Sequence, residues 1–114
     1  MSESVIDQPT FEDLKETVGA DYIAELVRAF LEEAPALIAQ LRPALIAGDT
    51  EAFRRAAHSV KSNASTFGAT RLYDLAKELE FMARENQLGE VGSRIEVLEE
   101  TFDRAAGVLT ELCA

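Results

Sequence analysis

Apolar residues recur every three or four positions along most of the chain, which is the spacing that places side chains on one face of an α-helix. The most regular run lies near the carboxyl end, where the intervals alternate between four and three residues as in a heptad seam. Its members are Val91, Ile95, Leu98, Phe102, Ala105, Leu109 and Leu112. We therefore expect a helical chain that ends in a long amphipathic helix.

A second apolar run extends from Ile23 to Ala44 and keeps its register through Pro35. A proline removes one backbone donor and crowds the preceding turn of a helix. We therefore expect one helix up to Gly48 that is kinked at Pro35, with Pro43 as a further candidate kink. Two helices broken at Pro35 are the alternative.

Capping residues indicate where the first helices begin. Thr10 followed by Asp13 resembles a capping box, so a short helix is expected to begin there and to stop at Gly19. Asp21 is the expected cap of the helix that contains the second apolar run.

Two more helices are expected in the middle of the chain. The first extends to Phe67, with Asp49 or Thr50 as its cap and Gly68 as its left-handed stop. Thr70 is the expected cap of the next, which ends before the turn sequence NQLGEVG. The apolar side of that helix is formed by Leu72, Leu75, Ala76, Leu79, Met82 and Ala83.

Four amphipathic helices joined by short turns can bury their apolar faces only against one another. This predicts an all-α fold, an up-and-down antiparallel four-helix bundle with a short extra N-terminal helix that covers one end. Residues 1–9 carry little apolar material and are expected to form a flexible N-terminal tail, with residues 10–114 as the single domain. The heptads could instead form a coiled-coil oligomer, but the glycine stops and short turns favour packing within a monomer.

The net charge of −10 over 114 residues argues against nucleic acid or an anionic membrane as partner, because both would repel the chain. No apolar run approaches the roughly 18 residues that cross a bilayer, and the first ten residues lack the features of a secretory signal. We therefore expect a cytoplasmic protein that binds other proteins. Cys113 is the only cysteine, which excludes an internal disulfide.

The only histidine of the chain, His58, is expected to face water. On a helical wheel it lies roughly 150° from the centre of the apolar face of its helix. A core imidazole and an ordinary surface histidine are the two alternatives that have no special function. The apolar face consists of Phe53, Ala56, Ala57, Val60, Ala64 and Phe67.

Cations and small hydroxyl residues surround this imidazole. Arg54 stands four positions before His58, and three residues follow it at three, four and seven positions: Lys61, Ser62 and Ser65. At these spacings the side chains lie on the same surface of a helix. An exposed imidazole among cations suits a group that meets a phosphoryl oxyanion. An ordinary solvated helix face is the alternative. From residue 50 to residue 77 the basic residues are Arg54, Arg55, Lys61, Arg71 and Lys77, against the acidic Glu51 and Asp74.

A carboxylate is expected on the neighbouring helix at the level of the histidine. If the third and fourth helices form a hairpin about position 69, the residue level with His58 is Glu80, since both helices rise equally per residue. We expect Glu80 to accept a hydrogen bond from Nδ1 of His58, which leaves Nε2 as a nucleophile. A surface carboxylate with no special role is the alternative.

The run AHSVKSNASTFGATRLYDLAKELE, residues 57–80, resembles the histidine-containing phosphotransfer (HPt) domain. The likeness extends over about residues 10–114. Ser62 stands where the family usually has glycine, and Ala76 stands where many members have cysteine. The residues that carry the resemblance are His58, Val60, Lys61, Ser62, Gly68, Leu79 and Glu80.

The resemblance implies a phosphorelay carrier rather than an enzyme. His58 would accept a phosphoryl group from the aspartyl phosphate of one receiver domain and pass it to another, with Lys61 and Glu80 assisting. The implied partners are response-regulator receiver domains and, as a further candidate, a hybrid histidine kinase. No cofactor of its own is implied, because the receiver would supply Mg²⁺, and the chain has no nucleotide-binding motif. Receiver docking and phosphate electrostatics would fall to Arg54, Arg55, Ser62, Ser65 and Lys77.

Two rival functions remain at this point. The first is a helical adaptor for protein–protein interaction that carries no phosphate. The second is the dimerising hairpin of a histidine kinase, which would need an ATP-binding domain and a different histidine box.

Overall fold

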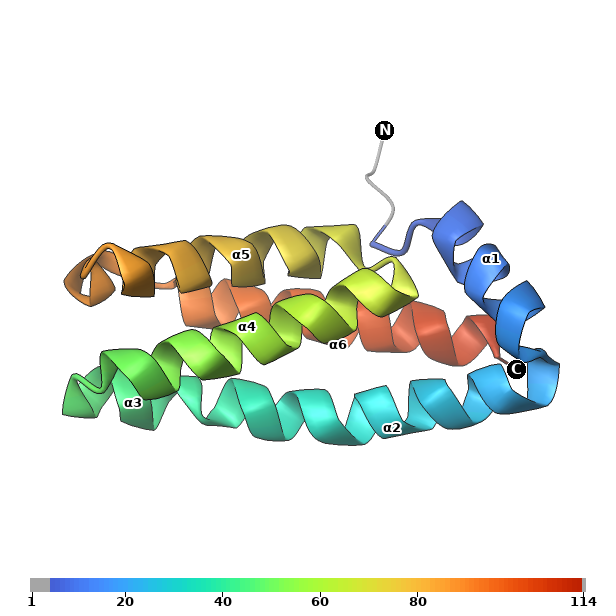
Figure 1. Ribbon diagram of the computed structural model, residues 1–114, viewed down its shortest axis with the longest axis horizontal. Coiled ribbons are helices and arrows are strands. Elements are labelled where there is room, and N and C mark those ends of the chain that lie inside the picture. Colours follow the sequence, from blue (N-terminus) through green and yellow to red (C-terminus); the bar gives the residue numbers. More distant parts are fainter. Residues whose placement is uncertain (1–4, 114) are drawn as a thin grey trace.

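The computed structural model describes residues 5–113, and this part of the chain contains helices and turns but no strand (Figure 1). Its longest dimension is 42 Å. The elements are α1 (Gln8–Val18), α2 (Ala20–Ala39), α3 (Leu41–Ala47), α4 (Thr50–Phe67), α5 (Thr70–Arg84), the short 3₁₀ helix η1 (Leu88–Glu90) and α6 (Arg94–Leu112).

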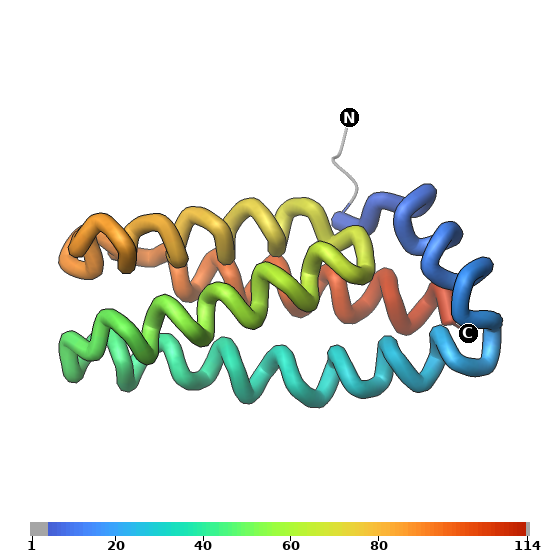
Figure 2. Tube along the Cα trace, viewed as in Figure 1, coloured from blue at the N-terminus to red at the C-terminus, as the bar shows by residue number. Residues whose placement is uncertain are grey.

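Four long segments lie side by side and form the predicted antiparallel bundle. The segment α2–α3 packs against α4, α4 packs against α5, α5 packs against α6, and α6 returns to α2 (Figure 2). Helix α1 crosses one end of the bundle beside the turn between α4 and α5 (Figure 1). No helix among residues 5–113 is apolar over a length that would cross a bilayer.

The apolar stripes read from the sequence form the core of a single chain. All six residues of the predicted apolar face of α4 are buried, and so is every member of the heptad run except Leu112, which is half-buried. At the centre the ring of Phe30 stacks on Phe67 at 4.9 Å and meets the edge of Phe102 at 5.6 Å. The heptad seam is therefore covered without a second copy of the chain.

The long second helix breaks at Gln40 and not at Pro35. Helix α2 stays helical through Pro35 and ends at Ala39. Pro43 cannot donate to the carbonyl of Ala39, and its ring crowds that carbonyl, so the helix ends there. The amide of Gln40 turns instead to the carbonyl of Leu37 at 3.1 Å. The predictions of one continuous helix and of a break at Pro35 are both wrong.

Helix α3 is held against α6 by one arginine. The guanidinium of Arg42 lies 2.7 Å from Oε2 of Glu99 and 2.8 Å from Oε2 of Glu96. The two carboxylates hold the pKa of Arg42 above its ordinary value, mainly through their hydrogen bonds. These exposed ion pairs connect α3 to α6 across the surface of the bundle.

The predicted capping box at Thr10 and Asp13 is wrong, because α1 begins earlier. Its cap is Asp7, whose carboxylate accepts the amide of Thr10 at 3.2 Å. Pro9 then lies in the first turn of α1, where backbone amides have no acceptor within the helix, so the proline removes no helical hydrogen bond.

The caps of the other helices divide between confirmed and wrong predictions. Asp49 caps α4 by accepting the amide of Ala52 at 3.1 Å, which decides between the two candidates. Asp21 and Thr70 are wrong as caps, since each lies inside the first turn of its helix and neither helix has a side-chain cap. Gly68, with φ of 74°, is the left-handed stop of α4 as predicted.

The predicted tail over residues 1–9 is wrong for residues 5–9, and residues 1–4 lie outside the described part. Ile6 is completely buried, and the amide of Asp7 donates to the carbonyl of Gly68 at 2.7 Å. A single buried isoleucine has no periodic neighbours, so the sequence pattern did not indicate its burial. The start of α1 is thereby attached to the turn that joins α4 and α5.

Candidate functional site

His58 lies on the outer face of α4 with 51% of its side chain exposed. Its Nδ1 atom is 2.9 Å from Oε2 of Glu80 on α5, so the predicted hydrogen bond is present. An ionised carboxylate only accepts hydrogen bonds, so the proton of this bond belongs to Nδ1. In the neutral imidazole, Nε2 then carries the lone pair.

Glu80 is a buried carboxylate, only 2% exposed, and is surrounded by donors. Lys61 Nζ lies 2.7 Å from Oε1, and Arg84 Nη2 lies 3.2 Å from Oε2, the oxygen that His58 also contacts. Burial by itself raises the pKa of Glu80, but the hydrogen bonds from Lys61 and His58 outweigh it and the pKa is lowered. The carboxylate is therefore ionised at neutral pH.

The hairpin of α4 and α5 explains why His58 and Glu80 meet. Gly68 adopts left-handed φ, where a residue without Cβ is favoured, and the chain reverses through Ala69. The two residues stand at equal distances from this turn along antiparallel helices of equal rise. The hydrogen bond between two residues 22 positions apart in the sequence therefore follows from the geometry of one hairpin.

The structure brings only some of the predicted residues to the imidazole. Lys61 shares the carboxylate of Glu80 with His58. Arg54 instead pairs with Glu51 one turn back, at 2.6 Å, and its hydrogen bonds lower the pKa of that carboxyl. The ammonium of Lys77 lies 6.0 Å from the centre of the Tyr73 ring. Exposed on the surface around them are Arg55, Ser62 and Ser65.

Arg84 is the member of the cluster that the sequence analysis did not include. It is the last residue of α5 and stands four positions after Glu80, the spacing at which side chains on a helix are neighbours. That spacing was the signal that could have found it.

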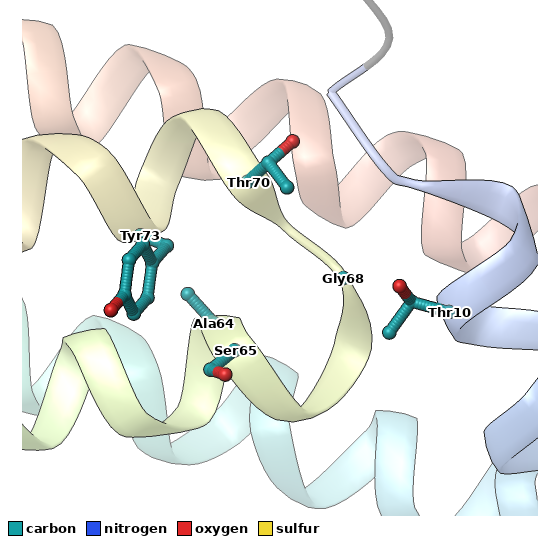
Figure 3. A pocket seen from close by; sticks show the side chains of 6 residues that line it. All are labelled: Thr10, Ala64, Ser65, Gly68, Thr70 and Tyr73. Carbon is teal, nitrogen blue, oxygen red and sulfur yellow. The ribbon is translucent and has the colours of Figure 1, made fainter.

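A shallow cavity opens on the same face, between α4 and α5 and beside α1 (Figure 3). It has a volume of about 320 Å³. Ser65 is seven residues from His58 and Tyr73 is seven residues from Glu80, so the cavity lies two helical turns, about 10 Å, from the imidazole. It is lined by Thr10, Ala64, Ser65, Gly68, Thr70 and Tyr73.

Metal-ligating side chains do not gather in the part of the chain that the structure describes. No group of three or more histidine, cysteine or carboxylate side chains lies close enough there to hold an ion. The chemical features of the site are therefore an imidazole, a buried carboxylate and two cations.

This chain belongs to the Hpt family. The sequence model of that family, described as "Hpt domain", matches residues 25–108, which include the whole His58 cluster. The resemblance inferred from residues 57–80 is thus confirmed.

Known members of the family show how far the similarity extends. The phosphorelay protein LuxU of Vibrio harveyi is 32% identical over 92 residues, 81% of each protein. LuxU of Vibrio vulnificus strain YJ016 is 28% identical over 102 residues, 90% of this chain and 81% of that protein. The crystal structure of histidine-containing phosphotransfer protein B (HptB) from Pseudomonas aeruginosa PAO1 superposes with a TM-score of 0.89 at 30% identity, covering 98% of this chain and 96% of that one. The chain is a phosphorelay carrier of two-component signalling.

Proposed function

We propose that Nε2 of His58 accepts a phosphoryl group from the aspartyl phosphate of one receiver domain and passes it to an aspartate of a second receiver. The observation that carries this proposal is the half-exposed imidazole whose Nδ1 is bound to the buried carboxylate of Glu80. The bond sets both the tautomer and the direction of the ring, as a hydrogen-bonded carboxylate does for histidine in other sites. The nitrogen that remains is the nucleophile.

The transfer balances without a proton leaving the histidine. The lone pair of Nε2 forms a bond to phosphorus while the bond between phosphorus and the aspartyl oxygen breaks, and the receiver recovers its carboxylate. The Nδ1 proton stays on the ring and donates to Glu80, which compensates the positive charge that develops there. Attack by the carboxylate of the second receiver reverses these steps.

The receiver supplies the groups that this surface does not have. We place Mg²⁺ and the residues that align the phosphoryl group on the receiver, because phosphoryl transfer needs a cation at the phosphoryl oxygens. The carrier adds the charge of Lys61, which lies 22% exposed beside the ring. No ATP enters this exchange, and we infer that the carrier works as a monomer in the cytoplasm, where receivers are phosphorylated.

We assign receiver docking to the surface of α4 and α5 around His58. Ser62 and Ser65 are small and exposed, so they let a partner surface approach the imidazole closely. Arg55 and Lys77 give this surface positive charge on a protein with a net charge of −10, which favours an acidic partner. The guanidinium of Arg54 can take part once it leaves the carboxylate of Glu51, its partner in the free protein. The cavity beside Ser65 gives the partner a recess for one side chain.

Incubation with a phosphorylated receiver tests the proposal directly. Wild-type protein is expected to take up phosphate in an acid-labile, alkali-stable form, and His58→Gln is expected to lose this uptake while keeping its helical circular dichroism, since the side chain is half-exposed. Glu80→Ala is expected to slow the uptake without abolishing it. Phosphate on a hydroxyl residue, or uptake that persists in His58→Gln, would contradict the assignment, and a wild-type protein that binds receivers without taking up phosphate would be an adaptor.

A further inference from the structure

Arg84 contacts the same carboxylate oxygen that orients the histidine. Its Nη2 atom is 3.2 Å from Oε2 of Glu80, and Nδ1 of His58 is 2.9 Å from that atom. Lys61 occupies the other oxygen, Oε1, at 2.7 Å. One buried negative charge is therefore shared by an imidazole and two permanent cations.

A carboxylate in this position has two opposing effects on a nucleophilic imidazole. Its hydrogen bond orients the ring, but its negative charge, shielded from water, also stabilises the protonated imidazolium. An imidazolium has a proton on both nitrogens and has no lone pair with which to attack phosphorus. The site therefore needs a counter-charge on Glu80 that lets the carboxylate orient His58 without protonating it.

Lys61 supplies counter-charge from Oε1, and Arg84 adds to it on Oε2, the oxygen that His58 also contacts. Arginine stays charged at every physiological pH. A guanidinium bound to Oε2 partly neutralises the negative charge of the oxygen that accepts the hydrogen bond from Nδ1–H. The arginine is 59% exposed, so it reaches the buried carboxylate from the solvent side of the site. Lys61 on α4 and Arg84 on α5 are thus the two cations that contact the carboxylate beside His58.

The nearby cations Arg54, Lys61 and Lys77 contact other atoms than Oε2 of Glu80. Arg54 is paired with Glu51, and Lys77 lies near the ring of Tyr73. Lys61 contacts Glu80 on the oxygen that His58 does not use. Arg84 is therefore the cation that shares an acceptor atom with the imidazole.

We propose that Arg84 is a positioning residue of the phosphotransfer site: by sharing Oε2 of Glu80 with His58, it lets the carboxylate hold Nδ1–H while the ring stays neutral and Nε2 stays nucleophilic. The inference rests on the proposed role of His58 as phosphoacceptor. It assigns to Arg84 an effect on the protonation of the ring and on the rate of uptake at acidic pH.

The test compares Arg84→Gln with a matched control on α6. Arg104 forms the same kind of pair, four residues after Glu100 at 3.3 Å, and its side chain is also 59% exposed. The proton occupancy of His58 is followed by NMR titration of the ring in the unphosphorylated protein, which needs no partner. Loss of one exposed charge at this range is expected to raise the ratio of imidazolium to neutral imidazole about threefold in Arg84→Gln at any pH within the titration. Arg104→Gln is expected to follow wild type, and Arg84→Lys to stay near it.

Uptake of phosphate is then measured in the same proteins. Arg84→Gln is expected to lose about threefold in rate on the acidic side of the pH profile. On the alkaline side its rate should equal or exceed that of wild type, because Glu80 still compensates the charge that develops on the ring. A titration curve of Arg84→Gln that superposes on those of wild type and Arg104→Gln would overturn the inference. Absence of phosphate on wild-type His58 would refute the proposed function instead, and the two failures are distinguishable because the titration does not depend on transfer.

Discussion

Replacing Gly68 by alanine should loosen the attachment of α1 to the hairpin that bears the site. Gly68 has φ of 74°, and a Cβ built there would lie 2.9 Å from the carbonyl oxygen of Asp7 and 3.0 Å from Cβ of Thr10. Both contacts are too short to keep, so the chain at Asp7 must move. Gly48 provides a matched control, because its φ is 69° and a Cβ there would meet nothing within 4 Å.

The structure gives the size of the effect. An alanine in left-handed conformation costs about 1 kcal/mol relative to glycine, and this cost falls on both variants. Gly68→Ala also disturbs the hydrogen bond from the amide of Asp7 to the carbonyl of Gly68, 2.7 Å long, whose net contribution is about 1 kcal/mol. Partial exposure of the buried Ile6 adds about 1 kcal/mol. We expect Gly48→Ala to lose about 1 kcal/mol and Gly68→Ala about 3 kcal/mol.

Urea unfolding followed by far-ultraviolet circular dichroism measures both losses. The midpoint of Gly68→Ala should fall well below that of Gly48→Ala, with little change in the slope of the transition. Equal losses in the two variants would refute the reasoning, because they would show that the contact between α1 and the turn contributes no stability. Since His58 lies nearly three helical turns from Gly68, its hydrogen bond to Glu80 should persist in the folded variant.

Two further predictions concern charge. Burial raises the pKa of Glu80, but the hydrogen bonds from Lys61 and His58 lower it more. The ionised carboxylate therefore stabilises the fold at pH values above the unfolded-state pKa of about 4.3. This stabilisation is lost as the pH falls through the lower pKa of the folded state. Glu80→Gln should therefore cost about 2 kcal/mol at neutral pH and progressively less in acid, as measured by urea unfolding across pH, whereas a pH-independent cost would contradict the charged pairing. Added salt shortens the electrostatic screening length from about 10 Å at 0.1 M to about 3 Å at 1 M. The KM for a phosphorylated receiver should therefore rise with salt concentration, and it should rise less steeply in Lys77→Gln. A KM that does not respond to salt would argue against docking by charge.

The sequence predicted the parts of the fold that depend on periodic patterns. The apolar face of α4 and the heptads of α6 are buried as expected. Apolar residues that repeat with the helical period lie on one face of the helix, and that face is buried against the neighbouring helices. The meeting of His58 and Glu80 was predicted for a similar reason, since two helices of equal rise around a glycine stop place equidistant residues at one level. These features depend on spacing alone.

The local ends and breaks of the helices were predicted less well. Several polar residues near the start of a helix can accept a free backbone amide, and the sequence does not say which one will do so. In α1 the helix begins at Gln8, so Asp7 is the cap and Thr10 is the residue whose amide it accepts. The break at Gln40 depends on Pro43, whose effect falls on the carbonyl four residues earlier, so the helix ends before the proline itself.

The sequence by itself determined the bundle, the exposed imidazole and the carboxylate level with it, because helical spacing converts directly into direction and height. Only the tertiary structure decided that Ile6 is buried, that Glu80 loses nearly all contact with water, and that Lys61 and Arg84 divide its two oxygens. Burial and the sharing of one acceptor depend on atoms brought together from different helices, and this packing leaves no periodic signal in the chain.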